Sequence, residues 1–376
     1  MLHLVIVESM PTLDVAMPTA LLIVTLVALF LNQRAEGKLA STVDQKEFKT
    51  RDILLLVIFI AIMISVIAFT SMVNPGGVFQ NVLLVLFLSS YTMLLFTFTY
   101  VFSNLTKKRA QIISAGFGIC SLIAGAVSFL EPLSDSYTLI RAGAFFALAA
   151  VCFGAVAFEY MKGTTRPRWY IAAQPPALFL LLFIFFTVLY GGTLNVWYPG
   201  LLDVFAFTFA ILIILYLSSM FNWKTVGIFA VLLTVLDVVL VFSGPMVAAA
   251  KTFTGLGLPV LVYLPNVPLV FTDAGAIGLR GLGLGDFFFA GILAVQTFKR
   301  FGKRTGIIAA IAMALAFGIW EAFLPEITAF FDIGGFPATV CIITGWIPVI
   351  AWKLLTTRNK PAFLPLDQPE SNPQST

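Results

Sequence analysis

The amino-acid sequence predicts an all-α protein that crosses a membrane many times. Of the 376 residues, 60% are hydrophobic and 11% are charged, whereas a soluble domain carries roughly a quarter charged residues. Runs of roughly 20 apolar residues recur along the chain, and a helix needs this length to cross a bilayer. We find no soluble domain. The net charge of +4 comes from basic loops and does not indicate nucleic-acid binding.

Eleven apolar stretches are predicted to be transmembrane helices, within a range of nine to eleven because the 53–103 region also permits shorter or re-entrant segments. The chain divides into an N-terminal transmembrane region at 1–199, a second transmembrane region at 200–358 and a tail at 359–376. The proline-rich tail is predicted to be a disordered cytoplasmic end. The eleven stretches are 15–31, 53–73, 79–103, 111–130, 138–160, 170–190, 200–221, 225–245, 274–298, 305–323 and 335–354.

The basic residues predict that the N-terminus is outside and the C-terminus is cytoplasmic. With this orientation, all but three of the 22 Lys and Arg residues fall on the cytoplasmic side, where such residues are enriched. The three exceptions are Arg141, Lys251 and Arg280. In a prokaryote the protein would lie in the cell membrane.

Two aspartates lie within hydrophobic stretches that contain almost no other charge. Asp237 follows Lys224 by 13 residues, and Asp286 precedes Lys299 by 13 residues. At about 1.5 Å per helical residue, both lie roughly 20 Å from the cytoplasmic boundary. The two helices run in opposite directions, so these equal offsets place the carboxylates at one depth. A carboxylate within a bilayer costs about 3 kcal/mol, so this pair predicts a functional site.

A pair of close carboxyl groups has the chemistry of an aspartic protease. Both cannot ionise cheaply, so one keeps its proton and the pair titrates as a unit. The ionised group activates a water, and the neutral group protonates the carbonyl oxygen. The single histidine, His3, argues against a zinc motif and a Ser-His-Asp triad. We therefore predict no metal and no cofactor.

Glycines alternate with leucines immediately before Asp286, at positions 281, 283 and 285. Their missing side chains allow another backbone to approach closely, or allow the helix to begin locally unwound. Ordinary helix packing through small residues is the alternative interpretation.

Three segments of the second half resemble the presenilin and signal peptide peptidase family. Residues 283–286 read Gly-Leu-Gly-Asp and resemble its GxGD motif. Residues 236–253 resemble its first aspartate segment and are particularly similar to signal peptide peptidase. Residues 335–339 read Gly-Phe-Pro-Ala-Thr and resemble its Pro-Ala-Leu motif. The order, the spacing and the position in the final span all match, and the similarity covers about residues 200–355.

The resemblance implies a presenilin-like helical bundle that acts as an intramembrane aspartyl protease. Asp237 and Asp286 would be its catalytic pair, and transmembrane helices would be its substrates. The residues expected to bind substrate are Gly283, Leu284, Gly285, Pro337, Ala338 and Thr339.

The chain departs from the family pattern at three points. Leu236 replaces the tyrosine that usually precedes the first aspartate, which removes a hydrogen-bond donor beside the pair. Thr339 replaces the leucine that usually follows Pro-Ala. The family has nine spans, whereas eleven are predicted here.

Residues 246–273 are not predicted to be a simple span, because Pro259, Pro265 and Pro268 interrupt any helix. Val260–Leu264 is predicted to be a short strand. A substrate helix must unwind before water reaches its peptide bonds, and the edge of this strand would pair with the freed backbone. An irregular loop on the membrane surface is the alternative.

Two other functions fit intramembrane carboxylates. A secondary transporter also uses such acids together with glycine-broken helices, although the halves of this chain show no convincing repeat. A catalytically inactive protein that binds or chaperones membrane helices is a second alternative, but both aspartates are present. The expected partners are transmembrane substrates and the lipid bilayer, with no nucleic acid. The sequence does not predict the oligomeric state.

Overall fold

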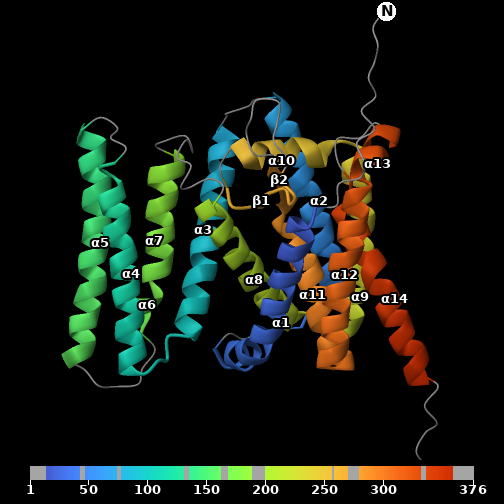
Figure 1. Ribbon diagram of the computed structural model, residues 1–376, viewed down its shortest axis with the longest axis horizontal. Helices are drawn as coiled ribbons and strands as arrows, with labels where there is room; N and C mark the ends of the chain where they lie inside the picture. Colours follow the sequence, from blue (N-terminus) through green and yellow to red (C-terminus); the bar gives the residue numbers. More distant parts are fainter. Residues whose placement is uncertain are drawn as a thin grey trace, which may run out of the picture.

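The computed structural model describes residues 14–42, 47–73, 78–130, 135–161, 168–188, 200–255, 258–269, 279–331 and 336–358. This part of the chain is a bundle of long helices with a small sheet near one end (Figure 1). Ten of the described helices are long and apolar enough to cross a membrane. The predicted fold class, an all-α multi-pass membrane protein, is therefore confirmed.

The first five helices follow the predicted spans. The region between residues 53 and 103 holds two full-length helices rather than shorter segments. Large apolar side chains on these two helices, such as Phe59 and Phe69, are exposed on the molecule, as expected for helices that face lipid. The five helices are α1 (Ala16–Thr42), α2 (Thr50–Val73), α3 (Val78–Val101), α4 (Lys107–Val127) and α5 (Asp135–Met161).

The sixth predicted span, 170–190, is broken into three pieces. They are α6 (Trp169–Ala172), α7 (Gln174–Phe183) and a π-helical turn, η1 (Ile184–Val188). Two prolines follow Gln174 and occupy the first turn of α7, where a missing backbone N–H costs nothing. These prolines explain why α7 begins afresh after the turn at Ala173.

Helix α11 (Leu284–Phe301) lies at the centre of the second half of the chain (Figure 1). It packs against α1, α8, α9, α12 and α14, and residues 289–297 are all buried. It is not among the ten helices counted above, because it carries three charged residues, Asp286, Lys299 and Arg300. The surrounding helices of this half are α8 (Leu202–Met220), α9 (Trp223–Phe242), α12 (Lys303–Ala322) and α14 (Ala338–Arg358).

A two-stranded antiparallel sheet leads directly into α11. Strand β1 (Leu261–Pro265) pairs with β2 (Leu279–Gly283), with Leu261 opposite Gly283 and Pro265 opposite Leu279. The strand predicted at Val260–Leu264 is therefore confirmed with a shift of one residue. The span predicted at 274–298 was wrong at its start, because the first two of the alternating glycines, 281 and 283, lie in β2 and the helix begins only at Leu284. Residues 274–278 lie outside the described part of the chain.

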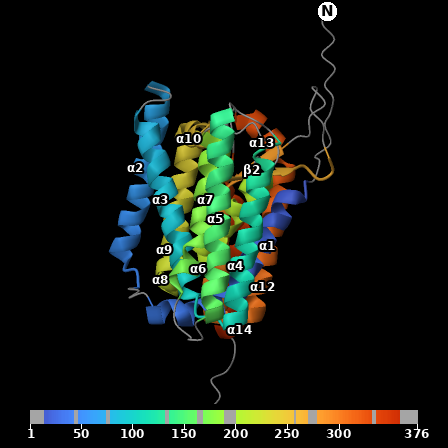
Figure 2. The same ribbon diagram turned by 90° about the vertical axis from the view of Figure 1, so that its left-hand side faces the viewer.

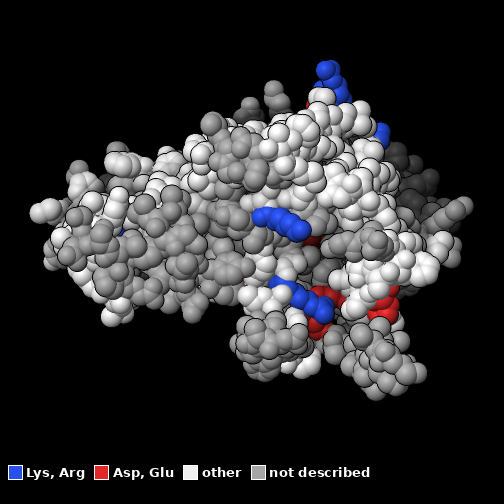
Figure 3. Space-filling model, turned by 90° about the horizontal axis from the view of Figure 1, so that it is seen from above, with Lys and Arg blue, Asp and Glu red and all other residues white. Residues whose placement is uncertain are grey.

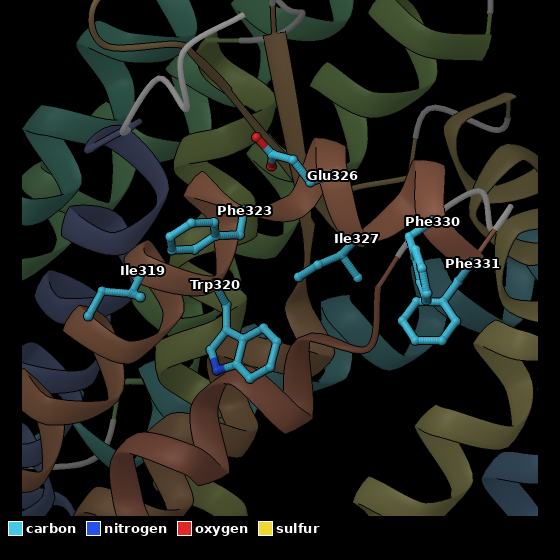
Figure 4. A pocket seen from close by; sticks show the side chains of 7 residues that line it. All are labelled: Ile319, Trp320, Phe323, Glu326, Ile327, Phe330 and Phe331. Carbon is cyan, nitrogen blue, oxygen red and sulfur yellow. The ribbon is translucent and has the colours of Figure 1, made fainter. Parts of the chain in front are cut away.

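Two short helices were not predicted. Helix α10 (Pro245–Gly255) follows α9 and lies across one end of the bundle (Figure 1). Helix α13 (Leu324–Phe331) follows α12 at the same end. An open apolar pocket of about 550 Å³ lies between α12 and α13, and Glu326 is the one titratable group among its described lining residues (Figure 4). Those residues are Ile319, Trp320, Phe323, Glu326, Ile327, Phe330 and Phe331.

Helices α4 and α5 form a hairpin at one side of the molecule (Figures 1 and 2). They pack mainly against each other and against α6 and α7. Close packing depends on small residues, because a Cβ at Gly125 of α4 would lie 2.7 Å from the Phe146 ring of α5. The buried ion pair between Arg168 and Glu159, at 2.6 Å, ties the end of α5 to the start of α6.

Candidate active site

Asp237 lies inside α9 and is buried, with 7% of its surface exposed. The helix begins after Asn222, which forms a capping box with Thr225. Between Lys224 and the end of α9, Asp237 is the only charged residue. Its Oδ2 atom accepts two hydrogen bonds from Thr339, one from the hydroxyl at 2.7 Å and one from the backbone N–H at 3.3 Å. Thr339 is itself buried.

Asp286 is the third residue of α11, and Gly283 is the N-cap of that helix. The Asp286 carboxylate accepts a hydrogen bond from the backbone N–H of Gly283. This contact is half of a capping box, in which an acidic third residue satisfies the N-cap N–H. As a whole residue, Asp286 is partly buried.

The structure brings Asp237 and Asp286 together. Helices α9, α11 and α14 all pack against one another, and the charge of Asp237 acts on the Asp286 carboxyl. The two acids that the sequence predicts at one depth are therefore near enough for their charges to interact. The thiol of Cys341 also lies within electrostatic reach of both carboxyl groups. No local sequence pattern marks Cys341 as a neighbour of the two aspartates.

The three residues before Asp286 differ in their surroundings. Leu284 is buried in the hydrophobic core, and its N–H donates to the Val260 carbonyl oxygen at 2.8 Å, so its contacts are structural. Gly283 is tightly placed, because a Cβ there would lie 3.3 Å from Oδ2 of Asp286. Gly285 is exposed, and a Cβ there would meet only the Phe288 ring at 3.8 Å. A side chain at position 283 would therefore crowd the Asp286 carboxylate, whereas Gly285 borders open space.

The Pro-Ala-Thr segment begins α14. Pro337 is buried directly before the helix, and Ala338 is the first helical residue. Phe336 stacks on Trp320 of α12 with ring centroids 5.2 Å apart. The segment thus places Thr339 beside Asp237, and Pro337 and Ala338 directly precede it in the chain.

Both edges of β1 are occupied, which was not predicted. One edge pairs with β2. On the other edge, the backbone N–H of Tyr263 donates to Oδ1 of Asp203, at 2.9 Å. Asp203 is buried in the first turn of α8. The prediction that β1 offers a free edge was therefore wrong, and the outer edge of the sheet among the described residues belongs to β2.

Besides Asp203, a group of three charged residues contacts the sheet: Arg280, Glu321 and Asp14. Arg280 of β2 donates to Glu321 of α12 at 3.0 Å and lies 3.8 Å from Asp14. Asp14 also accepts a hydrogen bond from the N–H of Val267 at 2.9 Å. Among the described residues, the view onto the end of the molecule near the sheet shows basic and acidic atoms side by side (Figure 3). Arg280, an exception to the charge rule in the sequence, is thus accounted for by ion pairing.

Within the described ranges, no group of three or more His, Cys, Asp or Glu side chains is arranged to hold a metal ion. His3 and the tail at 359–376 lie outside those ranges. No protein-family model, no curated protein and no solved structure matches this chain.

Proposed function

We propose that this membrane protein is an aspartic endopeptidase that hydrolyses peptide bonds within transmembrane helices. One observation carries the proposal: Asp237 and Asp286 come from two neighbouring helices of the bundle, and the charge of one acts on the other. Acids are rare inside membrane proteins unless they have a function. The resemblance of residues 200–355 to the presenilin and signal peptide peptidase family points to the same activity.

The pair would work by sharing one proton. The ionised carboxylate takes a proton from a water, and the water oxygen bonds to the scissile carbonyl carbon. The neutral carboxyl gives its proton to the carbonyl oxygen, which forms a neutral diol. The C–N bond then breaks as the nitrogen receives the proton held by the first carboxyl, and a diol hydroxyl returns a proton to the second. Each turnover consumes one water and restores the starting state.

The sheet would hold the unwound part of the substrate. A helix that opens in a membrane must satisfy its freed backbone groups elsewhere, and an unpaired strand edge satisfies them by β-augmentation. Because β1 is occupied on both sides, the receiving edge is that of β2, at Leu279, Gly281 and Gly283. This edge ends three residues before Asp286. A peptide bonded there would pass the aspartate pair.

The charge distribution of the sequence supports one direction for the substrate. With the N-terminus outside and the C-terminus in the cytoplasm, α9 runs outward and α11 runs inward. The expected substrates are then helices whose N-terminus is cytoplasmic, including leftover signal peptides. This orientation matches that of signal peptide peptidase and is opposite to that of presenilin.

The α4–α5 hairpin accounts for the difference between the eleven spans predicted here and the nine spans of the resembled family. Without α4 and α5, with α6, α7 and η1 counted as one crossing and α11 included, nine crossings remain. The resembled family has nine spans, so the hairpin is the additional part of this chain. It packs against α6 and α7, away from α9 and α11.

The test is cleavage of a labelled transmembrane peptide by the purified protein, with the products identified by mass spectrometry. Wild type should cleave the peptide, and Asp286→Asn should not. The matched control is Asp52→Asn, because Asp52 caps the Lys49 N–H at the other end of the bundle, and asparagine keeps an acceptor there. Proton-driven uptake of a solute into vesicles without any cleavage would instead support the secondary transporter and overturn the proposal.

A further inference from the structure

The two aspartates have different hydrogen-bond partners. Asp237 accepts two hydrogen bonds on Oδ2, both from Thr339, at 2.7 and 3.3 Å. Asp286 accepts from the backbone N–H of Gly283, within its own helix cap. The pair is therefore unsymmetrical, and a side-chain hydroxyl from a third helix accounts for the difference.

The position of Thr339 explains how it supplies two donors to one atom. It is the second residue of α14, and backbone N–H groups in the first turn of a helix have no partner within that helix. Its N–H and its hydroxyl therefore both point toward α9. Hydrogen bonds to a charged acceptor favour the ionised form and fix its orientation. With Oδ2 occupied, Oδ1 remains to hold a water.

The surroundings contain few other charges that would act on Asp237. Of the elements packed against α9, α11 brings Asp286 and α14 brings Cys341 near its carboxylate. Lys251 of α10 is exposed, and the charged residues of α2, Arg51 and Asp52, lie in its first turn at the other end of the bundle. Leu236, the preceding residue, has no donor in its side chain.

We propose that Thr339 is a positioning residue that keeps Asp237 ionised and oriented, so that Asp237 activates the water and Asp286 supplies the proton. This inference rests on the proposed protease activity and deepens it. It also gives a reason for a threonine at a position where the resembled family has leucine: the hydroxyl absent at position 236 is supplied from position 339.

The experiment measures peptide cleavage against pH for Thr339→Val and Thr339→Ser. Valine keeps the shape and the backbone N–H but removes the hydroxyl donor. The acidic limb of the profile should therefore move to higher pH by about one unit, so that the cleavage rate at a fixed pH on that limb falls about tenfold. Thr339→Ser should retain the wild-type limb. The matched control is Thr356→Val on the same helix, because the Thr356 hydroxyl bonds only to the carbonyls of Trp352 and Lys353.

The outcomes separate the two proposals. If wild type cleaves and Thr339→Val lowers activity equally at every pH, Thr339 is only structural and the inference is overturned. If wild type cleaves nothing, the protease proposal itself fails. Should Thr339→Val not fold, Thr339→Ala removes the same donor with less bulk. Infrared titration of wild type against Asp237→Asn then reads the Asp237 carboxyl band directly, and an unchanged band in Thr339→Ala would also overturn the inference.

Discussion

The backbone N–H of Tyr263 donates a hydrogen bond to the Asp203 carboxylate at 2.9 Å, and this contact closes the outer edge of β1. An unpaired edge of this kind is a template for another strand. A buried carboxylate from α8 therefore leaves β2 as the outer strand of the described sheet. The contact thus decides on which side a third strand can add.

Removing the acceptor at Asp203 should loosen the sheet. Asp203→Ala takes away the partner of the Tyr263 N–H, which costs about 1–3 kcal/mol when the group is buried. Asp203→Asn keeps an acceptor and should stay close to wild type. Thermal unfolding in detergent measures both variants. Equal stability of Asp203→Ala and wild type would show that the contact contributes nothing.

Both members of the aspartate pair should be indispensable. Asp237→Asn and Asp286→Asn each remove a group that exchanges protons in the reaction, so cleavage should fall by at least about 100-fold, with normal expression and fold. Asp→Glu should also fail, because a methylene displaces the carboxyl by about 1.5 Å and such misplacement costs about 100-fold. Substantial cleavage by any of these variants would remove that residue from the catalytic role.

The pH profile should be bell-shaped. At low pH both carboxyl groups are protonated, so no base remains to activate the water. At high pH both are ionised, so no acid remains to protonate the carbonyl oxygen. Initial cleavage rates across a buffer series, with and without a chelator, give the measurement. Activity that keeps rising into alkaline pH, or that the chelator removes, points to different chemistry.

Two glycines of α11 should respond differently to bulk. Gly285 is exposed, so Gly285→Leu should change stability by less than about 0.5 kcal/mol, yet abolish cleavage by blocking the approach of the substrate. Gly291 is packed, because a Cβ there would lie 2.4 Å from Ile214. Gly291→Ala should therefore cost about 1–3 kcal/mol of stability. Normal cleavage by Gly285→Leu would mean that Gly285 does not border the path of the substrate.

Substrate orientation should decide cleavage. Two reporters would carry one transmembrane sequence in opposite directions, set by moving the flanking lysines. The reporter with its N-terminus in the cytoplasm should be cut, because the aspartate pair is unsymmetrical and the proposed substrate strand on β2 must present its carbonyl in one chain direction. Preference for the other reporter contradicts the assignment, and so does cysteine labelling that places residues 299–304 outside.

The aspartate pair was predictable from the sequence because charges inside apolar spans are rare and because residue counting gives depth. Asp203 was not predictable, since it stands at the end of a predicted span, where an acid near the membrane surface is ordinary. The Thr339 contact joins residues 102 positions apart, and no local pattern encodes such a pairing. The free edge was assigned to the wrong strand because β2 was hidden within a predicted helix.

The short elements escaped prediction for related reasons. Helix α13 has only eight residues and carries Glu326 in its first turn, so residues 324–331 were placed in the connection that follows the predicted span 305–323. The break in the sixth span was visible as two adjacent prolines, although prolines in the first turn of a helix also fit an unbroken one.

The α4–α5 hairpin has a consequence for the direction of every later helix. A pair of crossings returns the chain to the side of the membrane that it left, whereas a single added helix would invert all that follow. Helices α9, α11 and α14 therefore face the same way with or without the hairpin. Adding an even number of crossings therefore enlarges this bundle without inverting the orientation of the aspartate pair in the membrane. The orientation of the substrates that it would accept stays the same as well.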